Sequence, residues 1–324
     1  MGVNGSVLAI DAGNSKTDVA LIGEDGTVLS TARGGGFQPP VVGIDTAVDV
    51  LGSAVERVLE SAGADAGSVA HVSACLANAD LPVEEEQLTE ALHARGWGRT
   101  VEVRNDTFAI LRAGADEPRG VAVVCGAGIN CVGMVPDGRT ARFPAIGRIS
   151  GDWGGGSGLS EEAMWFASRA EDGRGDPTEL ARTLPAHFGL GSMYALIEAL
   201  HLGRIAAERR HELSPVLFTT AAAGDAVARG LVDRLAEEVV ALSSVALSRL
   251  GLLDEVVPVV LGGSVLAARH PQLDARIGEL LAVRAPKAVV RVMKESPVLG
   301  AGLLGLDHTG AAPEVHARLR SQYV

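Results

Sequence analysis

Two copies of one pattern, a short strand followed by a glycine-containing turn and a second strand, constrain the fold of this chain more than any other feature. The first copy spans Val7–Ile22 and the second spans Val121–Val135, about 115 residues later. Apart from the glycines in the turns, the copies share no obvious side-chain identity. Two interpretations stay open at this point, a duplicated structural unit and two unrelated hairpins in a glycine-rich chain.

The residues around and after the first copy predict a complete α/β domain. Short apolar runs between turn residues indicate strands, and apolar positions at helical spacing indicate helices. Strands are expected at 7–10, 18–22, 28–33, 69–76 and 100–103, and helices at 44–62 and 83–96. The order β-β-β-α-β-α-β places the end of this domain near Asp106.

A second series of elements starts at the second copy of the pattern. Strands are expected at 120–125, 131–135, 140–143, 256–261 and 289–292, and helices at 159–170, 215–250, 297–306 and 315–319. A short helix is expected to start at 265–269. The chain therefore contains enough elements for two domains.

Charge and composition exclude several classes of protein. Twenty-eight basic and 40 acidic residues give a formal net charge of −12, which disfavours binding to nucleic acid or anionic lipid. With 47% hydrophobic residues, the chain can bury a core in each of two domains. The cysteines, Cys75, Cys125 and Cys131, form no CxxC pair, and no signal peptide or long apolar segment occurs. We expect a cytoplasmic protein that acts on a small molecule, with no nucleic-acid or membrane partner.

Glycine-containing turns follow three of the expected strands, at Asp11–Thr17, Gly126–Asn130 and Gly262–Ser264. Turns of glycine and small hydroxyl residues expose consecutive backbone N–H groups, which form a nest for an anion such as phosphate. One such turn alone usually has only a structural role. Three of them, together with an aspartate at each of two strand ends, predict a site for a phosphate-containing ligand.

Asp11 and Asp106 are the two aspartates at strand ends. Asp11 lies beside Gly13 and could hold Mg²⁺, because hard cations take oxygen ligands. Asp106 could accept the proton of an attacking hydroxyl, as an aspartate does in kinase catalytic loops. A capping or turn role is the alternative for each residue.

Other nucleotide-binding and hydrolase motifs are absent from the sequence. It has no GxxxxGK[ST] loop, no GxGxxG at a strand–helix junction, no GxSxG elbow and no HExxH pair. These absences argue against a Walker-type ATPase, a dinucleotide-binding domain, an elbow-type serine hydrolase and a zinc protease.

Six segments, in order along the chain, resemble the BadF/BadG-type branch of the sugar kinase/Hsp70/actin superfamily, most closely the N-acetylglucosamine kinase family. They are DAGNSKTD at 11–18, NDTFAILRAG at 105–114, CGAGINCVGMVPDGR at 125–139, GDWGGGSGLSEEA at 151–163, FTTAAAGDAVA at 218–228 and VVLGGSV at 259–265. The resemblance implies an α/β fold with two ribonuclease-H-like (actin-like ATPase) domains and an interdomain cleft, and it favours duplication. It implies an N-terminal domain at 1–107 plus a C-terminal helix at about 306–324, and a C-terminal domain at 108–305 with a helical insertion.

The resemblance also implies ATP and Mg²⁺ as cofactors. The residues implied to bind nucleotide are Asp11, Gly13, Asn14, Ser15, Lys16, Thr17, Gly126, Ala127, Gly128, Gly262, Gly263 and Ser264, with Asp11 close to Mg²⁺. Asp106 is implied to be the catalytic base. The residues implied to bind a sugar are Gln38, Asn78, Asp80, Asn105, Asp106, Ile129, Asn130, Gly147 and Asp152.

Three segments depart from the family pattern where a sugar or phosphate is implied to bind. The GTGSN turn reads GAGIN, so Ala127 and Ile129 replace two hydroxyl residues. The GGWG segment is replaced by AIGR at 145–148, and the loop that offers an asparagine and a tryptophan in the family reads FQPP at 37–40. A polar pocket rejects an analogue that leaves its groups unpaired, so these changes predict a changed sugar preference.

We therefore predict an ATP-dependent sugar kinase that phosphorylates a hydroxyl of a hexose or amino sugar, with N-acetylglucosamine or a related amino sugar as the favoured substrate. We also expect a homodimer. Two alternatives stay open. One is the ATPase activator of 2-hydroxyacyl-CoA dehydratases, which holds an iron–sulfur cluster with cysteines at a dimer interface. The other is a sugar sensor that keeps the kinase fold without turnover.

Overall fold

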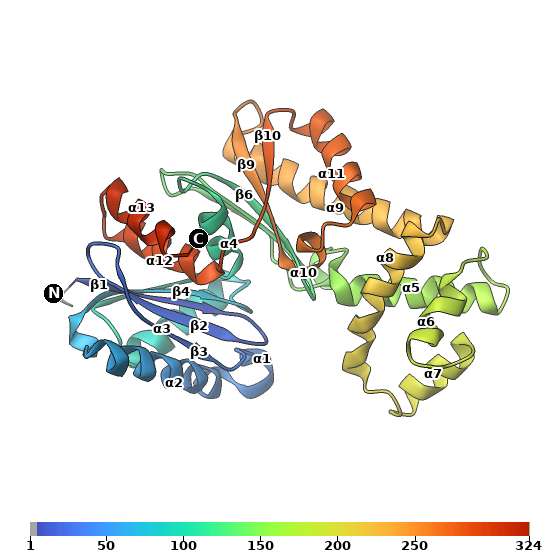
Figure 1. The fold of residues 1–324 in the computed structure, drawn as a ribbon, viewed down its shortest axis with the longest axis horizontal. Coiled ribbons are helices and arrows are strands. Elements are labelled where there is room, and N and C mark those ends of the chain that lie inside the picture. Colours follow the sequence, from blue (N-terminus) through green and yellow to red (C-terminus); the bar gives the residue numbers. More distant parts are fainter. Residues whose placement is uncertain (1–4, 324) are drawn as a thin grey trace. The chain divides into compact units, whose positions relative to one another are not determined.

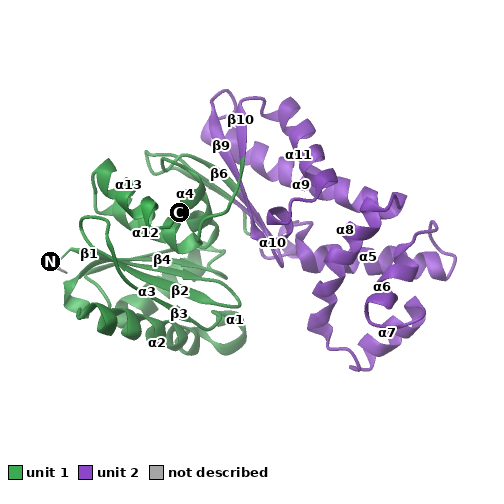
Figure 2. Ribbon diagram, in the orientation of Figure 1, with its two compact units in different colours: residues 1–122, 132–144, 291–324 green, residues 123–131, 145–290 purple. Residues whose placement is uncertain are grey.

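A computed structural model describes residues 5–323 of the chain (Figure 1). The chain divides into two compact units. The first contains residues 1–122, 132–144 and 291–324, and the second contains residues 123–131 and 145–290 (Figure 2). The domain boundaries expected at 107 and 306 do not coincide with the boundaries of these units, and the domain assignment stays a prediction. Val324, at the end of the expected C-terminal helix, lies outside the described residues.

A five-stranded sheet forms the centre of the first unit. Its strands are β1 (Ser6–Ala12), β2 (Thr17–Ile22), β3 (Val28–Gly34), β4 (Val69–Leu76) and β5 (Thr100–Asn105). Their order is β3-β2-β1-β4-β5. β2 is antiparallel to β1 and β3, whereas β1, β4 and β5 run parallel, so their carboxyl ends meet at one edge. This arrangement confirms the predicted order of strands and helices.

Helices cover both faces of this sheet. They are α1 (Pro39–Val42), α2 (Ile44–Ala62), α3 (Pro82–Ala94), α4 (Thr107–Gly114), α12 (Pro297–His308) and α13 (Pro313–Ser321), with a 3₁₀ turn at Ala66–Ser68. α2 and α3 pack on one face, where the apolar side of α2 and alternate residues of the strands form the core (Figure 1). α12 and α4 pack on the other face.

Glycines let α12 approach the sheet closely. A Cβ atom at Gly300 would overlap the carbonyl oxygen of Ala109 in α4, and a Cβ atom at Gly305 would overlap the side chain of Val7 in β1. Ser73 in β4 donates a hydrogen bond from its hydroxyl to the carbonyl of Ala301, at 2.7 Å. The last turns of α12 are thereby fixed against β1 and β4.

A second five-stranded sheet has the same strand order as the first. Its strands are β6 (Gly120–Cys125), β7 (Ile129–Met134), β8 (Thr140–Arg142), β9 (Val257–Gly262) and β10 (Ala288–Val292). The order β8-β7-β6-β9-β10 matches β3-β2-β1-β4-β5 strand for strand. The two copies of the sequence pattern are therefore equivalent parts of two sheets, and the fold prediction is confirmed.

The second unit contains the other helices of the described residues. They are α5 (Gly155–Glu171), α6 (Leu180–His187), α7 (Met193–His201), α8 (Leu213–Ala222), α9 (Ala226–Leu250), α10 (Gly263–Ala267) and α11 (Pro271–Arg284), with 3₁₀ turns at Arg148–Ser150 and Ala207–Glu212. α11 packs along α9, and α5, α6 and α8 pack together.

One prediction of local structure needs correction, and several helices were not predicted. The single helix expected at 215–250 is two helices, because Gly224 has a φ of 107° and Asp225 caps α9 by accepting a hydrogen bond from the Ala228 N–H at 2.8 Å. The helices α4, α6, α7 and α11 were not predicted, and α4 starts directly after Asp106. Within residues 5–323, no helix is long and apolar enough to span a membrane, and the cytoplasmic location stays a prediction.

Candidate active site

Asp11 and Asp106 lie at the carboxyl ends of the parallel strands in the first unit. Asp11 is the sixth residue of β1 and is in register with Cys75 of β4, so it lies in the strand and not in the turn predicted at 11–17. The N–H of Asp106 donates to the carbonyl of Leu76, the last residue of β4, at 3.2 Å. The two aspartates thus flank β4 at the same edge of the sheet.

Burial makes these two carboxyl groups weak acids, and repulsion from Asp106 adds to the effect at Asp11. The pKa of Asp11 is raised to about 8, mainly by burial and then by the negative charges of Asp106 and Asp18, while Lys16 opposes the shift. Burial raises the pKa of Asp106 to about 6 against the opposing hydrogen bonds of Thr107. A divalent cation would relieve this repulsion, and the oxygen ligands present are those that Mg²⁺ prefers.

The first glycine turn is shorter than predicted. Its ends are joined by a hydrogen bond from the Gly13 N–H to the Lys16 carbonyl at 2.9 Å. The Lys16 ammonium lies 3.0 Å from the Asp18 carboxylate, and Ser15, which precedes Lys16 in the turn, is exposed. Thr17 is buried in β2, and its hydroxyl donates to the carbonyl of residue 35 at 2.8 Å. The turn proper is Gly13–Lys16, and it presents backbone groups and exposed side chains to solvent.

Two residues implied to bind sugar hold this turn in place. Gln38 donates from Nε2 to the Asn14 carbonyl at 2.7 Å, and Asn78 donates from Nδ2 to Asn14 Oδ1 at 3.0 Å and to the Phe37 carbonyl at 3.2 Å. Gly36 completes the contact, because a Cβ atom there would overlap the carbonyl oxygen of Asn14. Gln38 and Asn78 therefore form one hydrogen-bonded network with the turn implied to bind phosphate.

Asn105 connects another implied sugar residue to the start of α4. Its side chain donates from Nδ2 to Asp80 Oδ1 at 2.8 Å and accepts from the Thr107 N–H at 3.0 Å. The backbone N–H of Asp80 in turn donates to Glu84 Oε2 at 3.0 Å. These bonds hold Asp106 between the end of β5 and the first turn of α4.

The second glycine turn, in the second unit, supports the start of α5. It comprises Gly126–Gly128, because Ile129 already belongs to β7. The N–H groups of Gly156 and Ser157 donate to the carbonyls of Gly126 and Ala127 at 2.7 and 3.1 Å. The N-terminus of α5 therefore lies against the turn. The N-terminal end of a helix favours anions.

The third glycine segment lies beside the second. Gly262 ends β9 and Gly263 starts α10, so the predicted turn is a direct strand-to-helix junction. Gly263 has a φ of 82°, and a Cβ atom there would overlap the backbone of Cys125. The structure thus brings two of the segments implied to bind nucleotide together, and Ser264 beside them is exposed.

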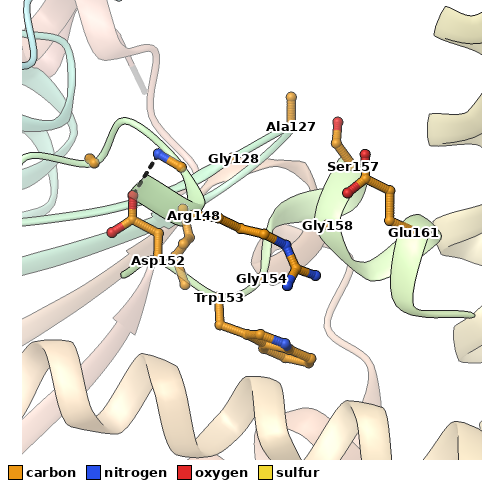
Figure 3. A pocket seen from close by; sticks show the side chains of 12 residues that line it. Ala127, Gly128, Arg148, Asp152, Trp153, Gly154, Ser157, Gly158 and Glu161 are labelled. Atoms are coloured by element: carbon orange, nitrogen blue, oxygen red, sulfur yellow. Dashed lines mark hydrogen bonds between the residues drawn. The ribbon is translucent and has the colours of Figure 1, made fainter. Parts of the chain in front are cut away.

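A pocket of about 210 Å³ opens beside the second glycine turn (Figure 3). Asp152 is fixed there, because its Oδ2 accepts from the Gly147 N–H at 2.8 Å, the dashed line in Figure 3, and from the Ser150 hydroxyl at 2.7 Å. Asn130 does not line the pocket, and its Oδ1 accepts from the Cys131 N–H at 2.7 Å. The pocket is lined by Ala127, Gly128, Ile129, Ala145, Gly147, Arg148, Asp152, Trp153, Gly154, Ser157, Gly158 and Glu161.

Sequence reasoning missed Trp153 in the lining of this pocket and two charged residues near the lining, Arg234 and Glu238. Trp153 is 8% exposed, its Nε1–H has no hydrogen-bond partner, and the Arg234 guanidinium lies 4.2 Å from its ring centre. The pKa of Glu238 is raised, mainly by burial of its carboxyl group and then by the nearby negative charge of Asp152. The glycine-rich segment 151–158 was the available signal, but only Asp152 was singled out from it.

A model of the BadF/BadG/BcrA/BcrD ATPase family matches residues 8–305. The chain belongs to this family. Among curated proteins, it is 25% identical over 301 residues to the N-acetylmuramic acid/N-acetylglucosamine kinase of Clostridium acetobutylicum, covering 92% of this chain and 97% of the relative. It is 24% identical over 314 residues to the N-acetyl-D-glucosamine kinase of Dictyostelium discoideum, covering 93% and 97%.

Solved structures support the fold of this family member. A putative N-acetylglucosamine kinase from Chromobacterium violaceum superposes with a TM-score of 0.70 at 22% identity, covering 94% of this chain and 99% of that chain. A ROK family glucokinase from Streptomyces griseus, solved with glucose and AMPPNP, gives a TM-score of 0.56 at 19% identity, with the same coverage. At these identities, the likeness establishes the fold alone.

Proposed function

We propose that this family member is an ATP-dependent sugar kinase that phosphorylates a hydroxyl of N-acetylglucosamine or a related amino sugar. The observation that carries the proposal is the placement of Asp106, half-buried at a strand end and close to Asp11, which directly precedes the glycine turn at 13–16. The activities named for both curated relatives, which cover more than nine-tenths of the chain, support it.

Asp106 is the proposed catalytic base. An aspartate is a much weaker base than an alkoxide, because a carboxylic acid is a stronger acid than an alcohol. It therefore contributes mainly by orienting the attacking hydroxyl, and it accepts the proton late in the reaction. The raised pKa of Asp106, about 6, improves its strength as a base while leaving it ionised at pH 7. The hydrogen bonds of Asn105 and Thr107 hold the backbone on both sides of this carboxylate.

The turn at Gly13–Lys16 is the proposed contact for the terminal phosphates of ATP. Its backbone N–H groups, Ser15 and Lys16 supply donors without a bulky side chain in the way. Asp11 is the proposed residue near Mg²⁺, which when bound neutralises charge on the phosphates. Gln38 and Asn78 keep the turn in shape through Asn14.

In the second unit, Gly126–Gly128 is the proposed second phosphate contact, supported by the N-terminus of α5. The neighbouring junction at 262–264 is the proposed contact for adenosine. For the sugar, the proposal assigns Ile129, Asn130, Gly147 and Asp152. Asp152 is held in one orientation by two donors and keeps its Oδ1 for a sugar hydroxyl.

The cysteines argue against the iron–sulfur activator. Cys75, Cys125 and Cys131 are each no more than 1% exposed, and burial raises the pKa of each thiol. A cysteine that binds such a cluster must be a thiolate and must be accessible to the other subunit. These thiols are protonated and buried, so they meet neither requirement. The homodimer stays part of the proposal.

ATP turnover with a panel of sugars tests the proposal. Coupled ADP release is measured with N-acetylglucosamine, glucosamine, N-acetylmuramic acid, N-acetylmannosamine and glucose at fixed Mg²⁺. The proposal predicts sugar-dependent ADP release with the highest kcat/KM for an amino sugar. ADP release that no sugar changes would favour an ATPase. Sugar binding without turnover across the panel would favour a sensor.

A further inference from the structure

His71, Glu102 and His308 form a side-chain cluster on the face of the first sheet that α12 covers. Each can offer one ligand atom, and these atoms lie within 4.8 Å of one another. His71 belongs to β4, Glu102 to β5, and His308 is the last residue of α12. We propose that this cluster binds a divalent transition-metal ion, with zinc as the best match.

The strand register places two of the three ligands side by side. His71 pairs with Thr100 of β5, and Glu102 is two residues farther along that strand, so both side chains point to the same face. The close approach of α12 at Gly305 then fixes the position of its terminal residue, His308, above them. The His71 and His308 rings are stacked, with centroids 3.8 Å apart and an interplanar angle of 9°.

A hydrogen-bond chain prepares His71 as a ligand. The Thr100 hydroxyl donates to the Ala70 carbonyl at 3.1 Å, so its oxygen can only accept from His71 Nδ1, which lies 2.9 Å away. On this basis we assign the proton of the neutral ring to Nδ1, which leaves the lone pair on Nε2.

His71 Nε2 is the unexplained atom at the site. His71 is 1% exposed, and its Nε2 has no hydrogen-bond partner. A buried acceptor without a partner costs free energy unless a ligand uses it. A histidine that donates through one ring nitrogen and offers the other is the usual arrangement of a metal ligand.

Glu102 is prepared in a similar way. Arg104 donates from Nε and Nη2 to Glu102 Oε1 at 3.0 and 2.7 Å, which leaves Oε2, 3.8 Å from His308 Nδ1. Glu102 and His308 also line a cavity of about 210 Å³, from which water can complete the coordination. Two histidines, one carboxylate and a water molecule are a common ligand set for zinc.

Binding requires a modest rearrangement of His308. Two nitrogen ligands of one zinc ion lie at most about 4.2 Å apart, since each Zn–N bond is about 2.0–2.1 Å long, and they converge on the metal. Stacked rings do not converge, so His308 must turn. Its side chain is 46% exposed and therefore free to rotate, and the negative end of the α12 dipole favours a cation there.

Zinc binding by the full chain, freed of metal with a chelator and without ATP or sugar, tests the proposal. Calorimetry is expected to give one zinc per chain with a micromolar or tighter Kd, and Co²⁺ is expected to give the visible absorption of a low-symmetry site. Mg²⁺ at millimolar concentration is expected not to compete, because imidazole ligands suit zinc. Zinc is also expected to raise the melting temperature.

Three variants separate this site from the active site. His308→Ala, on an exposed side chain, is expected to weaken zinc binding at least tenfold. His93→Ala, an exposed histidine at the end of α3, and Asp11→Asn are expected to leave binding unchanged. No zinc bound at one equivalent, or unaltered binding by His308→Ala, would overturn the proposal. Neither result depends on kinase activity, so the proposed function stands or falls separately.

Discussion

The negative charge of Asp106 raises the pKa of Asp11. The two residues lie at the carboxyl ends of β5 and β1, with only β4 between these strands. Parallel pairing of β1, β4 and β5 brings these carboxyl groups together, although 95 positions separate them in the sequence. Their closeness makes the negative charge of Asp11 costly until a cation or a proton compensates for it. This pairing leads to the first three predictions.

Replacement of the proposed base is expected to abolish turnover selectively. Asp106→Asn removes the proton acceptor but keeps the size of the side chain, so kcat is expected to fall about 10²–10⁴-fold while the Kd for ATP changes little. Steady-state kinetics and calorimetry with ATP measure the two effects. Asp137→Asn, in an exposed turn, is the matched control and should behave as wild type. A near-normal kcat for Asp106→Asn would exclude the assignment.

The pH profile is expected to report the ionisation of Asp106. The carboxylate form accepts the proton, and its pKa is about 6, so kcat/KM should fall below pH 6 and level off above it. The residual activity of Asp106→Asn should lack this inflection. An unperturbed aspartate would instead place the inflection near pH 4. That result would mean that the carboxyl group is solvated in the working enzyme.

Asp11→Asn is expected to stabilise the protein in the absence of metal. The folded-state pKa of about 8 lies above the unfolded value near 3.8, so the favourable contribution of protonated Asp11 is complete below pH 4 and is lost as the pH rises to 8. Removing the charge should add at least about 1 kcal/mol to the free energy of unfolding at pH 8. Urea unfolding in a chelator measures it.

Asp137 serves as the control for this prediction, because its pKa is shifted in the opposite direction. The pKa of Asp137 is lowered by Arg139, so Asp137→Asn should not stabilise the protein at any pH. A loss of stability in Asp11→Asn at pH 8 would contradict the account of the first unit, because it would mean that the Asp11 carboxylate is well compensated in the folded protein.

The contact between Gly36 and Asn14 can be tested by adding one methyl group. Gly36→Ala would force the turn at 13–16 outward, so the KM for ATP is expected to rise about tenfold or more and the melting temperature to fall. Gly230→Ala, in α9, meets no atom within 4 Å and should be neutral or stabilising. An unchanged KM in Gly36→Ala would show that the turn does not contact the nucleotide.

Local patterns predicted most of the first sheet, because apolar runs and glycine turns are encoded within a few residues. They left the duplication open, and the family resemblance favoured it. The break between α8 and α9 was missed, since apolar spacing continues across it and only Gly224 and Asp225 mark it. The helix α4 was missed because it follows β5 without a turn.

The network around Asn14 was beyond sequence reasoning for a different reason. Gln38 is 24 positions away and Asn78 is 64 positions away, so nothing in a local pattern connects them. The same holds for Trp153 and Arg234, and for the cluster of His71, Glu102 and His308. Such contacts depend on how distant segments pack, and only the folded chain reveals them.

Product identification tests the central claim most directly. The protein is incubated with ATP, Mg²⁺ and N-acetylglucosamine, or a related amino sugar, and the sugar is examined by mass spectrometry and ³¹P NMR beside an Asp106→Asn control. The account predicts one phosphate monoester on the sugar, formed by the wild type and lost in the variant. Consumption of ATP with the sugar left unmodified, or equal product from both proteins, would contradict it.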